Sequence, residues 1–163
     1  MILKVKKIKC NSYNYDSRHF RRLKTIDRIY LHYTANDGDS ANGNGLYFQK
    51  AHEPPTSAHY FIDREGNIVK SVPYHRTAYS VGNWEENCKS ISIELCDFNI
   101  NKEISEEQKQ SLIWLINYLK KKIPTIKYFK RHYDVTGKKC PLNLVDLKKW
   151  LEFKKGLNIK WII

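Results

Sequence analysis

Short runs of apolar residues separated by turn-forming residues indicate several β-strands along the chain. Residues 28–33 (RIYLHY) are rich in apolar and aromatic residues, which predicts a buried strand. Residues 90–96 alternate Ile and Leu with Ser and Glu, the period of two expected for a strand with one apolar face, and Glu94 falls on the opposite face. Residues 126–131 predict a last strand. Strands therefore recur from the first third of the chain to the last.

Residues 58–63 and 67–72 predict two further strands that are joined by a tight turn. The turn DREG ends in Gly66, and glycine suits the positive φ that such turns require. We therefore expect these strands to form a hairpin. The residues that follow, 73–88, read as a tyrosine-bearing loop.

Three segments have the pattern of helices. Ser105 and Gln108 form the start of a capping box. Helical spacing of apolar residues then continues toward Pro124, with the apolar face formed by Leu112, Leu115, Ile116 and Leu119. Residues 144–155 predict a closing amphipathic helix, and residues 46–52 a short helix that ends before two prolines.

The segment 34–45 is dense in Asn, Asp, Gly and Ser, which predicts a long irregular loop of the sort that often lines a site. Strands that alternate with helices predict an α/β layer fold. A length of 163 residues suits one domain, so we expect a single domain over residues 1–163. The tail 157–163 is a candidate for the start of a linker.

Basic residues outnumber acidic residues by 29 to 17, which gives a formal net charge of +12. Such a chain is attracted to polyanions, and nucleic acid, an anionic membrane surface and the anionic polymers of a bacterial wall all qualify. A solvated surface of lysines explains part of the excess. No helix-turn-helix, zinc-finger pair or aromatic RNA-binding strand is visible, so we expect no nucleic-acid partner.

The amino-terminal residues contain lysines but no continuous apolar run, so they lack the core of a secretory signal. No stretch approaches the roughly 20 apolar residues that cross a bilayer, so we expect no membrane insertion. Synthesis in a reducing cytoplasm would keep the four cysteines as free thiols. A cysteine near histidines is then a candidate metal ligand.

Three residues of metal-ligand type stand at the ends of predicted elements. His32 is near the end of the first buried strand, His132 follows the last strand, and Cys140 lies eight residues further on. Catalytic zinc commonly has three protein ligands, such as two His and one Cys, and an open fourth position. Spacing alone does not select this set, because six histidines and four cysteines offer many other triples.

Four motifs in order resemble the zinc-dependent N-acetylmuramoyl-L-alanine amidases, the type-2 amidase family that includes phage-lysozyme amidases and peptidoglycan-recognition proteins. They are LHYTA at residues 31–35, SAHYFIDREG at 57–66, SISIE at 90–94 and RHYD at 131–134, which leads to Cys140-Pro141. The resemblance covers residues 26–151, approximately. It implies a central mixed β-sheet flanked by α-helices, with a zinc cleft at one end of the strands.

The resemblance also implies roles for individual residues. It places the two histidine ligands of one zinc ion on His32 and His132, and the cysteine ligand on Cys140. It implies that Glu94 transfers the proton in amide hydrolysis, and an exposed strand carboxylate paired with a lysine is the alternative. Lys138 matches a lysine that would stabilise the oxyanion, and a solvated surface lysine is the alternative. The closest resemblance is to phage or prophage endolysins.

The chain departs from the family pattern at two places. Some members have a catalytic tyrosine immediately before the histidine matched by His59, and here that residue is Ala58. Tyr60 follows the histidine and is expected to point to the other face of the strand. We expect His59 to be a buried supporting residue rather than a ligand. The substrate loop, aromatic-His-x-Gly in many members, is Tyr79-Ser80-Val81-Gly82.

The resemblance implies a zinc amidase that acts on bacterial peptidoglycan, cleaving the bond between N-acetylmuramic acid and L-alanine. An endolysin of this type would be made in the cytoplasm of the bacterial host without a signal peptide and would reach the wall after release. Anionic wall polymers are candidate partners for the basic surface. A non-catalytic peptidoglycan-recognition module is the alternative, and the presence of Cys140 argues against it.

Overall fold

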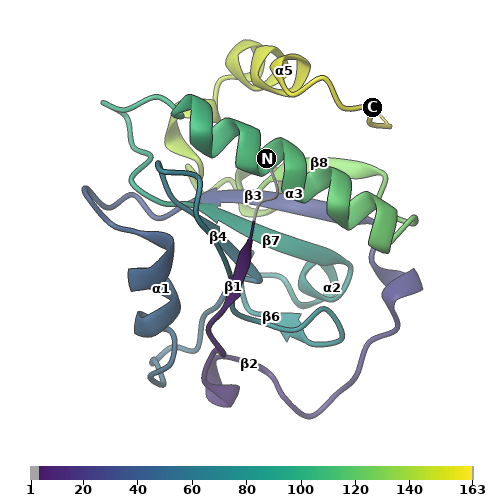
Figure 1. The fold of residues 1–163 in the computed structure, drawn as a ribbon. Coiled ribbons are helices and arrows are strands. Elements are labelled where there is room, and N and C mark those ends of the chain that lie inside the picture. Colours follow the sequence, from purple (N-terminus) through teal and green to yellow (C-terminus); the bar gives the residue numbers. More distant parts are fainter. Residues whose placement is uncertain (1–3, 163) are drawn as a thin grey trace.

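The computed structural model describes residues 4–162, which form a mixed, mostly parallel six-stranded sheet with helices on both faces (Figure 1). The strand order is β1-β5-β4-β7-β3-β8. In this order the strands are Val5–Lys7, Ile68–Lys70, Tyr60–Ile62, Ser90–Leu95, Arg28–Tyr33 and Tyr128–Arg131. A separate two-stranded sheet pairs β2 (Tyr15–Asp16) with β6 (Thr77–Ala78). The expected fold class is confirmed.

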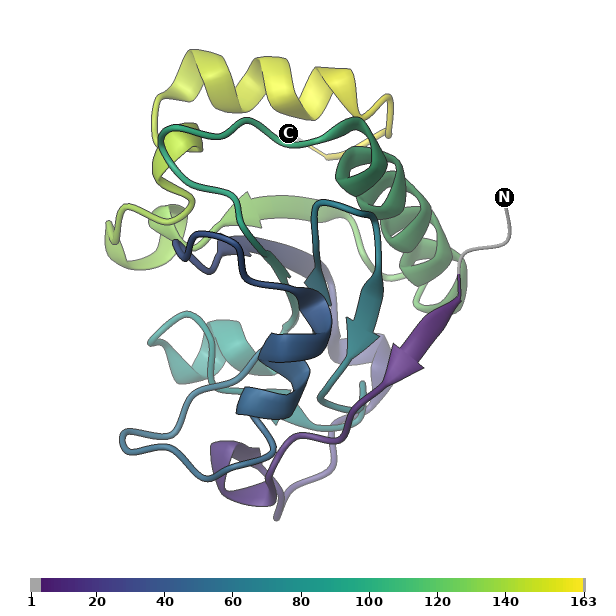
Figure 2. The same cartoon turned by 60° about the vertical axis from the view of Figure 1, so that its left-hand side comes forward.

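Helices α3 and α5 cover one face of the large sheet, and α1 and α2 lie on the other side (Figures 1 and 2). The helices are α1 Ala41–Tyr47, α2 Trp84–Cys88, α3 Glu106–Lys122, α4 Tyr133–Thr136 and α5 Leu147–Gly156. Short 3-10 turns occupy Ser12–Asn14, Leu23–Thr25 and Leu142–Leu144. Within residues 4–162, no helix is long and apolar enough to cross a bilayer.

The central strands β3 and β7 pair in parallel along their whole length. Ile91, Ile93 and Leu95 enter the main core beneath α3, as the alternating pattern predicted. His32 and Glu94 are register partners on the opposite face. The two strands therefore bring a histidine and a carboxylate together near their carboxyl ends.

Helix α3 begins as predicted, but its capping box is only half formed. Ser105 accepts a hydrogen bond from the Gln108 backbone N–H, at 3.1 Å. The Gln108 side chain does not reach back to Ser105. It donates instead to the carbonyl oxygens of Ile62 and Cys96, each at 2.9 Å. Tertiary contacts to the last residue of β4 and to the residue after β7 thus replace the local contact. The predicted apolar face of α3 is buried as expected.

The hairpin is also confirmed: β4 and β5 are antiparallel, and the turn between them has Gly66 at φ +81°. A side chain at Gly66 would meet the Ser111 hydroxyl at 2.8 Å and the Glu107 carbonyl oxygen at 3.0 Å. Glycine is therefore required both by the turn and by the close approach of α3.

The prediction of a helix over residues 46–52 is wrong, because the helix in this region is α1, which begins at Ala41 in the segment predicted to be irregular and ends at Tyr47. Ser40 caps it by accepting a hydrogen bond from the Gly43 N–H, and the buried Asp63 accepts one from the Ala41 N–H. A side chain at Gly45 would come within 2.9 Å of the side chains of Ile8, just after β1, and Val69 of β5. Capping and close packing outweigh the low helix propensity of the glycines.

Several short elements were not predicted, namely β1, β2, β6, α2 and α4. The edge strand β1 lies in the polar amino-terminal segment and pairs in parallel with β5. The segment 73–88, expected as a loop, contains β6 and α2. Each of these elements has two to five residues, which is too short to show a period in the sequence.

The carboxyl-terminal helix begins three residues later than predicted, because Asp146 provides its cap by accepting a hydrogen bond from the Lys149 N–H. After α5 the chain turns back onto the domain. Leu157 is buried in the main core, and the Trp161 ring stacks on Phe129 with 5.1 Å between centroids. Residues 157–162 therefore pack against the domain.

Candidate metal centre and catalytic cleft

Three side chains from separate parts of the chain converge at the carboxyl end of β3. The potential ligand atoms of His32, His132 and Cys140 all lie within 4.8 Å of one another, and all three residues are buried. The Cys140 Sγ is 3.8 Å from the His32 Nδ1, and the two imidazole rings meet edge to face at 5.0 Å. The structure thus brings together the three residues proposed as metal ligands.

The loop from His132 to Cys140 folds back on itself, which explains how two ligands eight residues apart reach one point. The Tyr133 N–H donates to the Cys140 carbonyl oxygen at 3.0 Å. Helix α4 fills the loop and ends at Gly137, whose φ of +75° is readily adopted by glycine. The loop is therefore closed by backbone contacts that do not depend on a bound metal.

A salt bridge between Arg131 and Asp134 stabilises this loop. The Arg131 guanidinium donates to Asp134 Oδ1 at 2.6 Å, and the Arg131 N–H donates to Asp134 Oδ2 at 2.8 Å. Arg131 also donates to the carbonyl oxygens of Leu144 and Val145. Both residues belong to the motif RHYD, in which only His132 was expected to have a role. Their supporting role could have been predicted from the sequence, because an arginine and an aspartate three residues apart flank the candidate ligand His132.

The electrostatic surroundings favour neutral histidines. Burial, together with the nearby His132 and Lys138, lowers the pKa of His32 well below its usual value. Burial and Lys138 lower the pKa of His132 to about 4, although a hydrogen bond to the Val81 backbone partly opposes this. Neutral imidazoles are the form that binds metal ions, and a backbone partner on the second ring nitrogen is typical of metal-binding histidines.

The donor set fits zinc in chemistry and in size. Bond lengths of about 2.0 Å to nitrogen and 2.3 Å to sulfur place tetrahedral ligand atoms about 3.3 to 3.6 Å apart. The observed 3.8 Å between Cys140 Sγ and His32 Nδ1 is close to this range. Burial raises the pKa of the Cys140 thiol to about 12. A coordinated cation would favour the thiolate instead.

Glu94 lies beside this group on β7. Its Oε1 is 3.9 Å from the His32 Nδ1, and its Oε2 is buried without a hydrogen-bond partner among residues 4–162. Burial raises the pKa of Glu94 to about 8; Lys138 opposes this shift and Asp39 adds to it. This value is that of the metal-free chain, and a bound cation would lower it toward neutrality. A carboxyl group whose pKa lies near neutrality can both accept and release a proton, as general acid–base catalysis requires.

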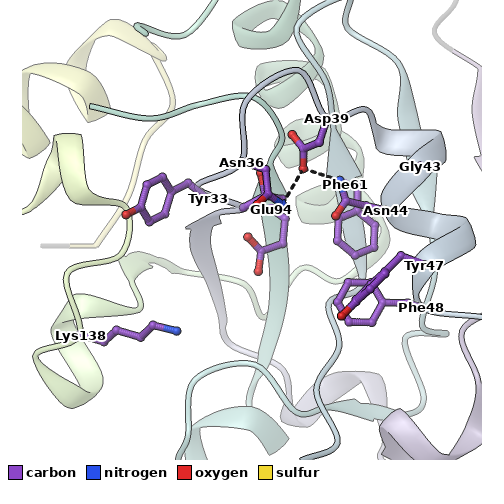
Figure 3. Close-up of a pocket in the computed structure, with 11 residues that line it drawn as sticks. Tyr33, Asn36, Asp39, Gly43, Asn44, Tyr47, Phe48, Phe61, Glu94 and Lys138 are labelled. Atoms are coloured by element: carbon purple, nitrogen blue, oxygen red, sulfur yellow. Dashed lines mark hydrogen bonds between the residues drawn. The ribbon is translucent and has the colours of Figure 1, made fainter. Parts of the chain in front are cut away.

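A cavity of about 470 Å³ opens in front of Glu94 (Figure 3). Lys138 extends into it from the loop that carries Cys140, on the side facing Glu94. The opposite wall is formed by α1, with Asn44 and Tyr47 among its lining residues. Residues 34–45 were expected to line a site, and several of them do line this cavity, but the helix that begins within the segment was not predicted.

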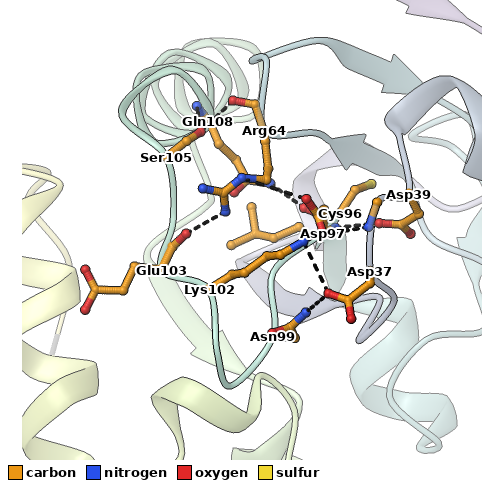
Figure 4. Close-up of polar contacts among 12 residues, drawn as sticks. Asp37, Asp39, Arg64, Cys96, Asp97, Asn99, Lys102, Glu103, Ser105 and Gln108 are labelled. Atoms are coloured by element: carbon orange, nitrogen blue, oxygen red, sulfur yellow. Dashed lines mark hydrogen bonds and ion pairs between the residues drawn. The ribbon is translucent and has the colours of Figure 1, made fainter.

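The loop 34–40, which precedes α1, also lines this cavity. A network of polar contacts holds the loop in place (Figure 4). The Lys102 ammonium lies between Asp97 Oδ1, at 2.5 Å, and Asp37 Oδ1, at 3.2 Å. Asp39 accepts a hydrogen bond from the Asp97 N–H and another from Asn44, at 2.7 Å. The loop 34–40 is therefore anchored to the end of β7 and to α1.

The structure places His59 outside the ligand group. Its Nε2 is 2.8 Å from the Arg21 guanidinium and 3.2 Å from the Arg76 carbonyl oxygen, and its Nδ1 accepts a hydrogen bond from the Ser92 N–H. Tyr60 points to the opposite face, where its hydroxyl meets that of Tyr74. Both positions agree with the sequence analysis.

The fold is shared with catalytic domains of endolysins. The catalytic domain of XlyA superimposes with a TM-score of 0.77 and 26% identity, covering 95% of this chain and 99% of that one. A mutant endolysin from Bacillus subtilis gives a TM-score of 0.75 and 25% identity, with coverage of 96% and 99%.

The family model for N-acetylmuramoyl-L-alanine amidase matches residues 22–143, and the chain belongs to this family. Curated relatives include the N-acetylmuramoyl-L-alanine amidases CwlL of Bacillus licheniformis, 34% identical, and BlyA of Bacillus subtilis (strain 168), 28% identical. The alignments cover 93% and 92% of this chain, but only 45% and 47% of those proteins. The chain thus spans about half the length of the curated relatives it matches. The family expected from the motifs is confirmed.

Proposed function

We propose that this chain is a zinc-dependent peptidoglycan amidase, which hydrolyses the amide bond between N-acetylmuramic acid and L-alanine. The observation that carries the proposal is the convergence of His32, His132 and Cys140 beside Glu94 in a member of this family. These three side chains would hold one zinc ion per chain. When bound, zinc would polarise the scissile carbonyl and lower the pKa of a water molecule toward about 7.

Glu94 is proposed to carry the proton through the reaction. Its carboxylate accepts a proton from the attacking water as the oxygen bonds to the lactyl carbonyl carbon. It then delivers that proton to the nitrogen of L-alanine as the C–N bond breaks, leaving a carboxylic acid on the lactyl group of the sugar and a free amine on the peptide. The acid then releases its proton to the amine or to solvent. The partner-free Oε2 supports this role, because no protein group competes for it among the described residues.

Lys138 is proposed to stabilise the oxyanion that develops on the carbonyl oxygen. Its ammonium extends into the cavity that Glu94 lines, and its charge acts on His32, His132 and Glu94. The alternative is a solvated lysine with no part in catalysis. The adjacent Lys139 is also exposed and does not line the cavity, so it provides a matched comparison.

The proposed biological role is that of a phage or prophage endolysin, with residues 1–163 acting as one catalytic domain. The partner is bacterial peptidoglycan, which the enzyme would reach from the host cytoplasm after release. The +12 charge would add attraction to anionic wall polymers. The competing proposal is a recognition module that binds peptidoglycan without cleaving it.

The test is to incubate the purified chain with bacterial cell walls and with a soluble muramoyl peptide, in zinc and in excess chelator. We expect the turbidity of the walls to fall and new peptide amines to appear only when zinc is available. Binding to walls without any release of amines would support the recognition module instead.

A further inference from the structure

A second pocket, the basic edge pocket, lies at the other end of the sheet from the cleft. It has a volume of about 290 Å³ and is bordered by Lys7, Lys9, Lys70, Ser71 and Pro73. The cleft lies at the carboxyl ends of the parallel strands β3 and β7. Strand β5 runs antiparallel to β4, which is parallel to β7, so the carboxyl end of β5 at Lys70 lies at the opposite end.

The lysines of this pocket are not neutralised by acidic residues. Lys7 and Lys70 are register partners on adjacent strands, where like charges destabilise the pairing. Among residues 4–162, no carboxylate lies within 4.0 Å of the ammonium groups of Lys7, Lys9 or Lys70. Burial lowers the pKa of Lys70 to about 8, and both Lys7 and Lys122 contribute to this shift.

The Lys70 ammonium is held in a defined position. Its Nζ lies 3.2 Å from the centre of the Tyr74 ring, a cation–π contact, and 6.0 Å from the centre of the Tyr60 ring. The hydroxyl groups of the two tyrosines are hydrogen-bonded to each other. The charge of Lys70 therefore cannot move away from Lys7 as freely as that of an exposed lysine.

Protection of the sheet edge explains only part of this arrangement. Strand β1 is an edge strand, and lysines on such strands discourage pairing with other chains. This accounts for Lys7, the last residue of β1, and for Lys9 just beyond it. It does not account for Lys70, which is half-buried on an inner strand. An anion between Lys7 and Lys70 would offset the repulsion between them.

We propose that the basic edge pocket binds a phosphate group of the phosphodiester polymers of the bacterial wall. This inference rests on the proposed function, which brings the enzyme to the wall and so favours a wall polymer over nucleic acid. The pocket and the cleft lie at opposite ends of the sheet, so polymer and peptidoglycan would bind without competing. The pocket would tether the domain while the cleft works on neighbouring glycan chains.

The test compares two double variants that lose the same charge. Lys7→Gln/Lys9→Gln removes two lysines of the pocket, and Lys148→Gln/Lys155→Gln removes two exposed lysines of α5. Co-sedimentation with isolated walls, before and after chemical removal of their phosphodiester polymers, measures binding across a salt series. We expect the pocket variant to bind intact walls on the order of tenfold more weakly and with a smaller salt dependence.

We expect the control variant to bind intact walls nearly as the unmodified chain does, and the pocket variant to show no defect on stripped walls. An equal loss in both variants would assign the effect to overall charge and overturn the proposal. The same loss on stripped walls would exclude the phosphate as ligand. Tighter binding to a DNA fragment than to intact walls would assign the pocket to nucleic acid.

A third variant, Lys70→Gln, tests the half-buried lysine directly, and we expect it to weaken binding to intact walls as the first does. Turnover of a soluble muramoyl peptide separates this inference from the proposed function. All three variants should retain that turnover, since none alters the cleft. If the unmodified chain fails to release amines but the pocket variant still loses wall binding, the proposed function fails while the pocket stands.

Discussion

His32 and Glu94 are register partners on β3 and β7, with 3.9 Å between Nδ1 and Oε1. Parallel pairing along all six residues of both strands fixes this relationship through the backbone. The proposed ligand and the proposed proton carrier therefore keep their spacing independently of the loops around them. Cys140 and Lys138, in contrast, depend on the loop that Arg131 and Asp134 brace.

Replacing Cys140 should remove the metal. We expect Cys140→Ser to lose most of its zinc, because a neutral hydroxyl is a far weaker ligand than a thiolate. Cys88→Ser makes the same change at a half-buried cysteine away from the ligand group and should retain one zinc per chain. Elemental analysis of both proteins, purified without chelator, provides the measurement. Equal zinc in the two variants would exclude Cys140 as a ligand.

The raised pKa of Glu94 predicts how the stability of the metal-free protein changes with pH. Its pKa is about 8 in the folded chain against a usual 4.5, so its contribution to stability is complete below pH 4.5 and is lost as pH rises through 8. Glu94→Gln should remove this loss. Urea unfolding in chelator at pH 5 and pH 9 should show the variant gaining stability, relative to the unmodified chain, at the higher pH. A difference that is the same at both values would contradict the prediction.

The two adjacent lysines should differ in their effect on turnover. We expect Lys138→Met to lower kcat about tenfold with little change in KM, since an exposed cation contributes less than a buried oxyanion donor. Lys139→Met should leave both constants unchanged. Steady-state kinetics on a soluble muramoyl peptide would distinguish the roles. Equal behaviour of the two variants would make Lys138 a solvated surface lysine.

The central strands could be predicted from the sequence because their patterns are local. β3 is mostly apolar or aromatic and β7 alternates, so each signal lies within six residues. The edge strand β1 has no such signal, because three mostly exposed residues are ordered by pairing with a distant strand. Helix α1 escaped prediction because Asp63, 22 residues from Ala41, supplies one of its caps.

The candidate site could be predicted only in part, because it also depends on contacts between residues that lie far apart in the chain. Motifs identified His32, His132 and Cys140, but spacing alone could not select them. The register that sets Glu94 beside His32 depends on the pairing of two strands that lie far apart in the chain. The cavity wall formed by Asn44 and Tyr47 could not be predicted, because it depends on the position of α1, which is set by tertiary contacts.

The most direct test of the account is the turnover of Glu94→Gln on a soluble muramoyl peptide, measured together with its zinc content. Glu65→Gln, at an exposed carboxylate in the hairpin turn, serves as the control. We predict that Glu94→Gln retains one zinc per chain and loses roughly 10²- to 10⁴-fold in kcat, the usual contribution of a general acid–base group. Near-normal turnover by a zinc-loaded Glu94→Gln would contradict the account and assign the proton transfer to another group.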